Sequence, residues 1–223
     1  MKPFEILFED QHLIVLSKAP GVLSQADISG EDSLVELLRT HFGRHYVGLV
    51  HRLDRNTSGL MVVAKRSKSA ERLTSQLQDG RLIRKYRAVL EGTFTGNATW
   101  KHWLLKNEKT NEVRAVKEGT SGAKAAALSV KSIANFLTHG EPVTLVEFEL
   151  ETGRSHQIRV QSATMKHALI GDPKYGTPKG MKLFSRPALH SSFLEFEHPI
   201  TKEVVQFEQI TATDWDFDAI TQN

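Results

Sequence analysis

A nine-residue polar run at residues 51–59 constrains what this chain can fold into, because it lies between two apolar stretches that must be buried. It is therefore expected to be a loop that joins two buried elements. An ordinary loop of this kind needs one or two turn-forming residues, but this one also holds a single carboxylate, Asp54, flanked by Arg52 and Arg55. A carboxylate between two guanidinium groups is expected to stay ionised, which suits an anionic nucleophile and not a general acid.

Asp54 also has a purely structural interpretation. An Asp before Asn-Thr-Ser-Gly can accept hydrogen bonds from backbone N–H groups in an Asx turn, or pair with Arg52 or Arg55 at the surface. The residues of the loop leave both interpretations open, so the rest of the chain must decide between a structural and a chemical role.

Composition excludes several classes of protein. With 223 residues, 39% of them hydrophobic and 25% charged, the chain is long enough for one large domain or two closely joined ones. Cysteine is absent, which excludes disulfides, thiolate metal sites and a cysteine nucleophile. The sequence contains neither a signal peptide nor an apolar run of membrane-spanning length, so we expect a cytoplasmic protein with no membrane association.

Charge is distributed unevenly along the chain. Residues 65–87 contain eight Lys and Arg against two acids, a balance of 8 − 2 = +6, whereas residues 191–223 contain seven acids against one Lys, a balance of 1 − 7 = −6. A basic segment of this kind fits a polyanionic partner, although it also fits the solvated face of a helix.

Apolar periodicity and turn residues predict strands joined by hairpins, with three helices among them. The expected elements are a hairpin of 4–8 and 13–16, a helix at 34–42 after the start signal 29–32 and before Gly43, a strand at 60–64, a helix at 68–78 before Gly80, strands at 81–91, 100–105, 113–117, 130–136 and 143–150, a helix at 156–168, a turn cluster at 171–176, and a closing hairpin of 189–196 and 204–210, followed by a frayed or surface-packed acidic tail.

This order of elements predicts an α+β (mixed α/β) fold with a largely antiparallel sheet, in one domain that spans residues 1–223. The sequence contains no glycine-rich dinucleotide motif and no P-loop, which removes the usual grounds for a nucleotide cofactor. Its ten histidines have no metal-ligand spacing, so no metal is expected, and His156 and His190 are the two that merit a test.

Two further polar segments could carry chemistry. In Thr152 to Arg159, two arginines five residues apart could direct one charge inward and one toward phosphate, although Arg154 alone could simply cap or pair locally. Tyr86 lies in Arg84-Lys85-Tyr86-Arg87, where an aromatic residue among cations fits base stacking beside a phosphate-binding surface. Without those basic neighbours, a tyrosine on a strand would be read as core packing, and this alternative stays open.

Together, these motifs resemble those of the RluA family of pseudouridine synthases. The run at 51–59 resembles that family's signature around its catalytic aspartate, residues 84–92 its tyrosine motif and 150–159 its arginine motif. Later landmarks of the family resemble the segments 171–176, 188–190 and 196–199, so the resemblance spans nearly the whole chain in the expected order.

The resemblance implies an isomerase that converts uridine in RNA to pseudouridine without metal or organic cofactor, on a single catalytic domain with a cleft across its sheet. By motif, the implied catalytic residues are Asp54, its ion-pair partner Arg159, and Tyr86, which would pack on the target base. Extrusion of that base from its helix would be needed before the reaction. The implied substrate-binding residues are Arg52, which would fill the vacated stack, Ile158 as apolar floor, and Arg55, Arg84, Lys85, Arg154 and His156, with the segment from Lys65 to Arg87 following the phosphates.

The chain also departs from the family's pattern. Its opening motif reads Lys18-Ala19-Pro20-Gly21 where the family usually has Lys-Pro-x-Gly, Ser24-Gln25 replaces a frequent His, and Gln161 stands where His is common. Because three residues precede Phe4, we expect no S4 RNA-binding domain and a resemblance to the shorter members that act on tRNA or on rRNA stem-loops. A monomer without an obligatory protein partner is expected.

Two rival functions fit some of the same residues. One is a non-catalytic RNA-binding module or RNA chaperone in which Asp54 is structural, so that Asp54→Asn would behave like the wild type. The other is a metal-assisted hydrolase that uses Asp54, Asp172 and a histidine, and that would lose its activity in a chelator.

Overall fold

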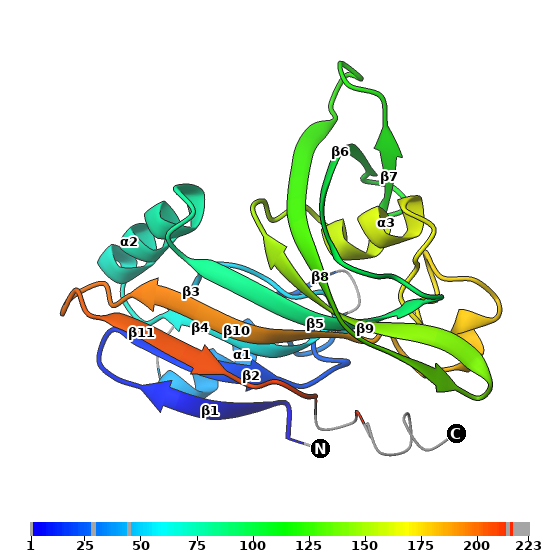
Figure 1. The fold of residues 1–223 in the computed structure, drawn as a ribbon. Coiled ribbons are helices and arrows are strands. Elements are labelled where there is room, and N and C mark those ends of the chain that lie inside the picture. The colour runs from blue at the N-terminus through cyan, green and yellow to red at the C-terminus, as the bar shows by residue number, and fades with distance from the viewer. Residues whose placement is uncertain (1, 28–29, 44–45, 213–214, 216–223) are drawn as a thin grey trace. The chain divides into compact units, whose positions relative to one another are not determined.

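The structure, a computed structural model, describes residues 2–27, 30–43, 46–212 and 215 (Figure 1). These residues divide into two compact units, one formed by the chain up to Arg84 together with His190–Ala212, and the other mainly by Lys85–Leu189. The chain passes from the first unit to the second within strand β5 (Ile83–Glu91) and returns within β10 (Leu189–Glu197).

In the first unit the strands lie in the order β1, β2, β4 and β10, with β3 paired to β4 and β11 paired to β10. All of these pairs are antiparallel except β4 with β10, which run parallel. The bounds are Phe4–Glu9 for β1, Leu13–Lys18 for β2, Gly48–Leu49 for β3, Ser58–Ala64 for β4 and Val204–Glu208 for β11.

Helix α2 (Ser67–Gln78) packs on this sheet against β3 and β4, and lies above its strands in Figure 1. Its Leu73 is fully buried, and Ala70 and Leu77 pack partly buried against the same core. Removing one such leucine from water contributes about 2 kcal/mol. The core that they join consists of Leu13, Val15, Val50, Leu60, Val62, Ala64, Leu82, Leu194 and Phe196.

Several predicted elements of this unit are confirmed. The hairpin of β1 and β2 and the closing hairpin of β10 and β11 both form, and every residue of β4 is buried. Helix α1 spans Leu34–Phe42 and ends at Gly43, whose left-handed φ of 61° lets its N–H reach Arg39 and Thr40 carbonyls. The first residue of the predicted start signal, residue 29, lies outside the described residues, as does most of the acidic tail.

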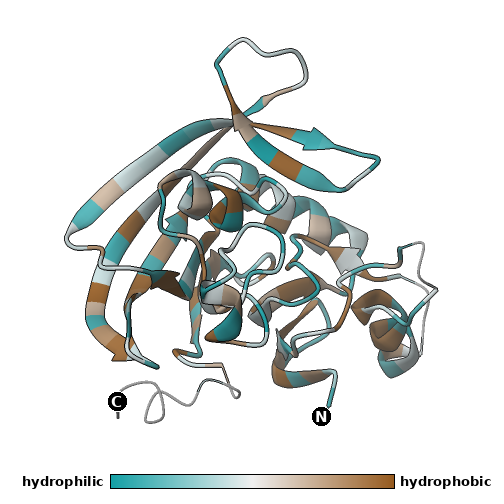
Figure 2. Ribbon diagram, turned by 90° about the vertical axis from the view of Figure 1, so that its right-hand side faces the viewer, coloured by the Kyte–Doolittle hydropathy of each residue, from teal (hydrophilic) through white to brown (hydrophobic). Residues whose placement is uncertain are grey.

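In the second unit five strands pair antiparallel in the order β5, β9, β8, β6 and β7. Figure 2 shows hydrophobic and hydrophilic residues in alternation along the long strands, as expected where one face is buried. The bounds are Asn97–Asn107 for β6, Glu112–Val116 for β7, Lys124–Thr138 for β8 and Glu141–Leu150 for β9.

The strands β6 and β8 are longer than the sequence indicated, because residues 97–104 pair with 124–131. Alanines 125–127 favour helix by propensity, yet this cross-strand pairing holds them extended. Helix α3 (Gln157–Thr164) packs against β6 and β7, with Val160 in a small core beside Leu104, Val113 and Ala126. The predicted end of this helix at Ala168 was wrong, because Lys166 takes a left-handed φ of 64° and the chain turns away.

The chain is an α+β protein with mostly antiparallel pairing and three α-helices in the described residues, as predicted. The further predictions of a single domain over residues 1–223 and of a cleft across the sheet stay predictions. None of the helices in the described ranges combines the length and the apolar character that crossing a membrane requires.

Candidate active site

The loop between β3 and β4 carries Asp54, the carboxylate of the polar run at residues 51–59. Asp54 is half-buried, and its carbonyl accepts a hydrogen bond from the N–H of Thr57 at 3.0 Å, so residues 54–57 form a tight turn. Arg52 is exposed, whereas the side chain of Leu53 is buried. The loop therefore presents Arg52 to solvent while Leu53 anchors it to the unit.

Ser24 binds the residue that precedes Asp54. Its hydroxyl donates to the carbonyl of Leu53 at 2.7 Å and accepts from the N–H of Leu53 at 3.1 Å. One side chain thus makes both hydrogen bonds that a residue of a neighbouring strand would make. Because Ser24 is only 5% exposed, water has little access to replace these bonds.

Lys18 binds the loop on the other side of Asp54. Its side chain is 1% exposed, and its ammonium donates to the carbonyls of Ala19, Val22 and Arg55 at 2.9, 2.8 and 3.0 Å. Three carbonyl oxygens match the three donors of an ammonium group, which is the condition for burying one. The segment that contains Lys18 and Ser24 therefore holds the loop both before and after the carboxylate.

The charge of Arg55 is directed away from the turn. Its Nη2 lies 2.6 Å from a carboxylate oxygen of Glu31, and its Nε donates to the carbonyl of Gly21 at 3.1 Å. Both side chains of this ion pair are substantially exposed, so it contributes little to stability.

Where the loop enters β4, the side chain of Ser58 is hydrogen-bonded to His190 of β10. The Nε2 of His190 lies 2.9 Å from the carbonyl of Gln209, which can only accept, so Nε2 carries the hydrogen. Nδ1 lies 2.9 Å from the hydroxyl of Ser58, from which it accepts when the ring is neutral. Gly59 follows with a φ of 107°, and an added Cβ would lie 2.2 Å from the carbonyl oxygen of Ser191, so only glycine fits.

His51 begins the polar run as a buried neutral side chain. Its Nε2 accepts from the N–H of Val62 at 3.3 Å, which leaves the hydrogen on Nδ1. Burial, and then the guanidinium of Arg84, lower the pKa of His51 from 6.5 to about 3. Arg84 is itself only 6% exposed, and its expected contact with RNA stays a prediction.

In the second unit, Arg159 on α3 makes a bidentate ion pair with Asp172. Nε and Nη2 of Arg159 donate to the two carboxylate oxygens at 2.7 and 2.8 Å. The Asp172 carboxylate also accepts from the N–H groups of Lys174 and Tyr175 at 2.9 and 3.1 Å. Burial on its own raises the pKa of Asp172, but these hydrogen bonds and the positive charge of Arg159 outweigh it and hold that pKa below its usual value.

Tyr175 connects Arg159 to the start of the same helix. The guanidinium carbon of Arg159 lies over the Tyr175 ring, 5.1 Å from its centroid. The hydroxyl of Tyr175 accepts from the N–H of Val113 at 3.0 Å. The same hydroxyl lies within hydrogen-bonding distance of Nδ1 of His156, at 2.7 Å. The helix N-terminus, the arginine and the turn at 171–176 therefore form one polar cluster.

Tyr86 and Ile158 are both buried, and Tyr86 stands opposite Phe148 in the pairing of β5 with β9. The neighbouring cations of β5 have acidic partners in the adjacent strand. Lys85 lies 3.8 Å from Glu147 and 3.6 Å from Glu149, and Arg87 lies 3.6 Å from Glu147. Part of the basic segment at 65–87 is therefore balanced by acids inside the protein.

Arg154 is exposed and lies in the turn before α3, where its Nε donates to the carbonyl of Ala125 at 2.9 Å. The side chain of Gln157 organises this turn by accepting from the N–H of Arg154 at 2.9 Å and from the hydroxyl of Thr152 at 2.7 Å. The turn leaves Arg154 exposed to solvent, as a phosphate contact would require.

The structure thus assembles two clusters, one around Asp54 in the first unit and one around Arg159 in the second. The ion pair expected between Asp54 and Arg159 stays a prediction, whereas Asp172, which the sequence suggested only as a metal ligand, binds Arg159. Lys18 and Ser24 were not predicted to have roles. The signals were the opening motif at 18–21 and the departure at Ser24, both of which lie far from Asp54 in sequence.

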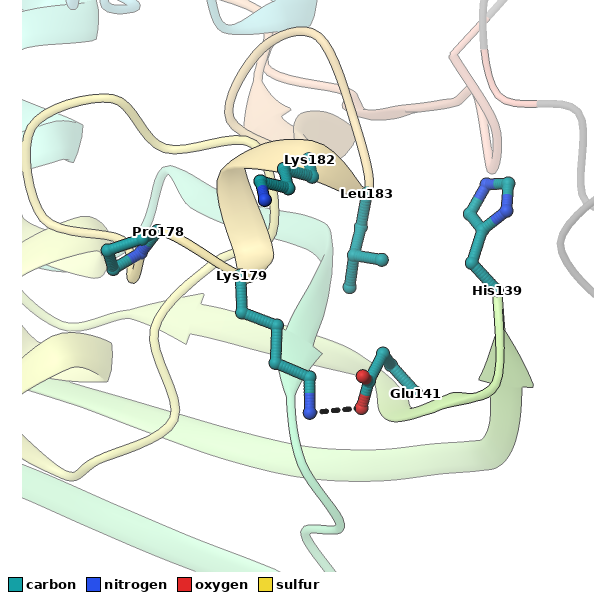
Figure 3. Close-up of a pocket in the computed structure, with 6 residues that line it drawn as sticks. All are labelled: His139, Glu141, Pro178, Lys179, Lys182 and Leu183. Atoms are coloured by element: carbon teal, nitrogen blue, oxygen red, sulfur yellow. Dashed lines mark ion pairs between the residues drawn. The ribbon is translucent and has the colours of Figure 1, made fainter.

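The second unit also has a surface pocket of about 640 Å³. Figure 3 shows Lys179 and Glu141 joined by an ion pair at this pocket, with His139 and Leu183 from neighbouring turns. None of the residues that line the pocket was predicted to take part in the reaction; they are His139, Glu141, Pro178, Lys179, Lys182 and Leu183.

Comparison with known proteins identifies a matching family model and similar chains. The family model described as RNA pseudouridylate synthase matches residues 12–164. The chain is 34% identical over 222 residues to a ribosomal large subunit pseudouridine synthase D from Zymomonas mobilis. This match covers 92% of this chain and 68% of the relative. It is 35% identical over 209 residues to the uncharacterized RNA pseudouridine synthase YhcT of Bacillus subtilis, covering 92% of this chain and 67% of that one.

Among solved structures, the fold is similar to that of human RNA pseudouridylate synthase domain containing 1, with a TM-score of 0.76 and 25% sequence identity. The match covers 95% of this chain and 86% of the human one.

Proposed function

Because the chain belongs to the RNA pseudouridylate synthase family and is an RNA pseudouridine synthase, we propose that Asp54 is its catalytic carboxylate and that its substrate is a uridine in tRNA or ribosomal RNA. In this isomerisation the bond between N1 of uracil and C1′ of ribose breaks, and C5 is joined to C1′. A proton leaves C5 for water and N1 gains one, so no second substrate is consumed.

The observation that carries the proposal is the support around Asp54. If the Asp54 carboxylate only closed a surface turn, residues of that turn would suffice to hold it. The loop is instead hydrogen-bonded to Ser24 before Asp54 and to Lys18 after it. A catalytic group must be held to within a fraction of an ångström, which requires such a supporting shell. Asp54 also lies inside the segment that the family model matches.

A uridine in a helical stem is stacked and paired, so its C1′ and C5 are out of reach until the base is extruded. We propose that Arg52 stabilises the extruded state by entering the vacated stack. Its exposure, two residues from Asp54, supports this role. The neighbouring Arg55 would contact the RNA at the rim of the loop, after exchanging Glu31 for phosphate.

The residues of the second unit are assigned by motif. We expect Tyr86 to pack on the target uracil, Ile158 to provide an apolar surface beside it, and Arg159 to pair with the catalytic carboxylate. Arg154 and His156, in the turn before α3, are expected to contact phosphates. The cluster of Arg159, Asp172 and Tyr175 supports the assignment of Arg159, because it gives the guanidinium a defined orientation.

We propose ribosomal RNA of the large subunit as the first substrate to test, because the Zymomonas mobilis relative is named for that RNA. Pseudouridines in tRNA and rRNA should be mapped in cells with and without the gene. Loss of one or a few sites in large-subunit rRNA is expected, and sites lost only in tRNA would contradict this choice of RNA. Cytoplasmic location and a monomeric state stay predictions.

The role of Asp54 is tested by release of tritium from RNA labelled at C5 of uridine, since C5 loses its hydrogen in the reaction. Wild-type protein should release tritium, and Asp54→Ala and Asp54→Asn should lower the rate by at least about 10³-fold, as the loss of a nucleophilic or acid-base group does. Their affinity for RNA, measured by filter binding, should change little.

The matched control is Asp79→Asn. Asp79 is an exposed carboxylate at the end of α2 that pairs with Arg81, so its replacement adds the same unit of charge without touching the loop. Full activity of Asp54→Asn would favour the rival function, a non-catalytic RNA-binding module. A fall in activity shared by both variants would indicate a general effect of charge.

A further inference from the structure

The hydroxyl of Ser24 makes its two hydrogen bonds to one peptide unit on each side of Leu53, the residue bonded to Asp54. It donates to the carbonyl at 2.7 Å and accepts from the N–H at 3.1 Å. The Leu53 carbonyl belongs to the peptide group that joins Leu53 to Asp54. Rotation of that peptide would therefore break a hydrogen bond to Ser24 and move the Asp54 carboxylate at the same time.

Ser24 also connects this peptide to the sheet. Its hydroxyl lies 4.0 Å from the sulfur of Met61, which is fully buried in β4. Leu53 is buried as well, and the Thr57 N–H bond to Asp54 closes the following turn. The burial of Leu53 and the hydrogen bond from Thr57 fix the path of the loop without any contribution from Ser24. The hydrogen bonds of Ser24, by contrast, set the rotation of the peptide before Asp54.

We infer that Ser24 is a positioning residue for the reaction, whose two hydrogen bonds to Leu53 orient the Asp54 carboxylate toward the target nucleotide. This inference rests on the catalytic role proposed for Asp54. Ser24 does not touch the RNA in this role. Its loss should therefore change the rate of the chemical step, because a shift of about 1 Å in a catalytic group can cost about 100-fold in rate.

The experiment is single-turnover tritium release with enzyme in saturating excess over labelled RNA. Under these conditions the rate constant reports bound, folded enzyme and is independent of any fraction that unfolds. Ser24→Ala should lower this rate constant by about 10- to 100-fold, while the Kd for RNA stays within about twofold. Ser24→Thr keeps the hydroxyl and should retain the rate to within about threefold.

Ser191→Ala is the matched control. Ser191 is a fully buried serine of the same unit, and its hydroxyl donates to the carbonyl of Leu60 in β4 at 3.0 Å. Its replacement removes a buried hydrogen bond to the same stretch of chain, beyond the loop. It should lower the unfolding temperature about as much as Ser24→Ala does and leave the rate constant unchanged.

Two results would overturn the inference: a Ser24→Ala rate within about threefold of the wild type, or equal slowing in Ser24→Ala and Ser191→Ala, which would make Ser24 a structural residue only. Asp54→Ala is measured in parallel. If Asp54→Ala retains activity, the proposed function of Asp54 fails. If Asp54→Ala is inactive and Ser24→Ala is not slowed, the failure is confined to the role of Ser24.

Discussion

At the scale of single residues, three buried polar side chains meet the same difficulty in different ways. An ionised group that leaves water must find partners, or it gives up its charge. Lys18 finds three carbonyl oxygens, and Arg159 finds the carboxylate of Asp172. His51 is buried beside the guanidinium of Arg84 and stays neutral, which its pKa of about 3 expresses.

The neutral state of His51 predicts a dependence of stability on pH. Its pKa is about 3 in the folded protein against 6.5 as the ordinary value, so between these limits the unfolded chain binds more protons. Stability from this group is complete above pH 6.5 and falls as the pH is lowered toward 3, by up to about 1.4 kcal/mol per pH unit. Urea unfolding at pH 7, 6, 5 and 4 should show a shallower decline in His51→Gln than in the wild type.

The matched control for His51 is His139→Gln, because His139 is exposed. Its unfolding free energy should follow the wild-type curve at every pH. Equal slopes in the wild type and in His51→Gln would show that His51 is charged or solvated in the folded protein.

At the scale of elements, the position of Asp54 depends on how β4 pairs at its first residues. Ser58 and Gly59 pair in parallel with His190 and Ser191 of β10, and the close approach leaves no space for a side chain at Gly59. The loop that holds Asp54 ends where this pairing begins, so the strand contact determines where the loop can end.

Gly59→Ala is expected to disrupt this contact. Its Cβ would lie 2.2 Å from a backbone oxygen, and its φ of 107° is strained for any residue with a side chain. We expect a loss of at least about 3 kcal/mol in the free energy of unfolding, measured by urea titration followed through tryptophan fluorescence.

Gly80→Ala provides the comparison for Gly59. It has a similar left-handed φ of 80°, but nothing lies within 4 Å of the added Cβ, so only the backbone cost of about 1 kcal/mol applies. An equal loss of stability in Gly59→Ala and Gly80→Ala would show that the close approach of β4 and β10 does not restrict position 59 to glycine.

At the scale of the whole molecule, charge is distributed so that one segment is basic and the C-terminal part acidic. Part of the basic segment is neutralised internally, since Lys85 and Arg87 face acids of β9. Lys68, on the exposed face of α2, remains directed to solvent. We therefore expect α2, and not the outward cations of β5, to make the larger sequence-independent contribution to RNA binding.

Lys68→Glu should weaken RNA binding and reduce the slope of log Kd against log salt concentration by about 1, because one phosphate contact releases about one counterion. Filter binding between low and moderate salt measures both quantities. Lys202→Glu is the control, because Lys202 lies in the acidic segment and pairs with Glu197. An RNA affinity that does not change with salt, or equal effects of the two reversals, would contradict a basic RNA-binding face.

The sequence alone determined the order of elements, the fold class and the family. Short-range signals suffice for these, because the hairpins around 9–12 and 198–203, the helix before Gly43 and the motif at 51–59 each depend on neighbours in the chain. Sequence signals did not identify the strand at alanines 125–127, because there the pairing with residues 101–103 overrides the helix propensity of alanine.

Only the tertiary structure decided which groups support the candidate site. Ser24 lies 29 residues from Leu53, and Lys18 lies 37 residues from Arg55, so no local pattern indicates that they meet. Arg159 binds Asp172, which lies 13 residues away in the same unit and which the sequence did not indicate as its partner. A sequence shows which charges exist, but burial and distance decide which of them interact, and both are properties of the folded chain.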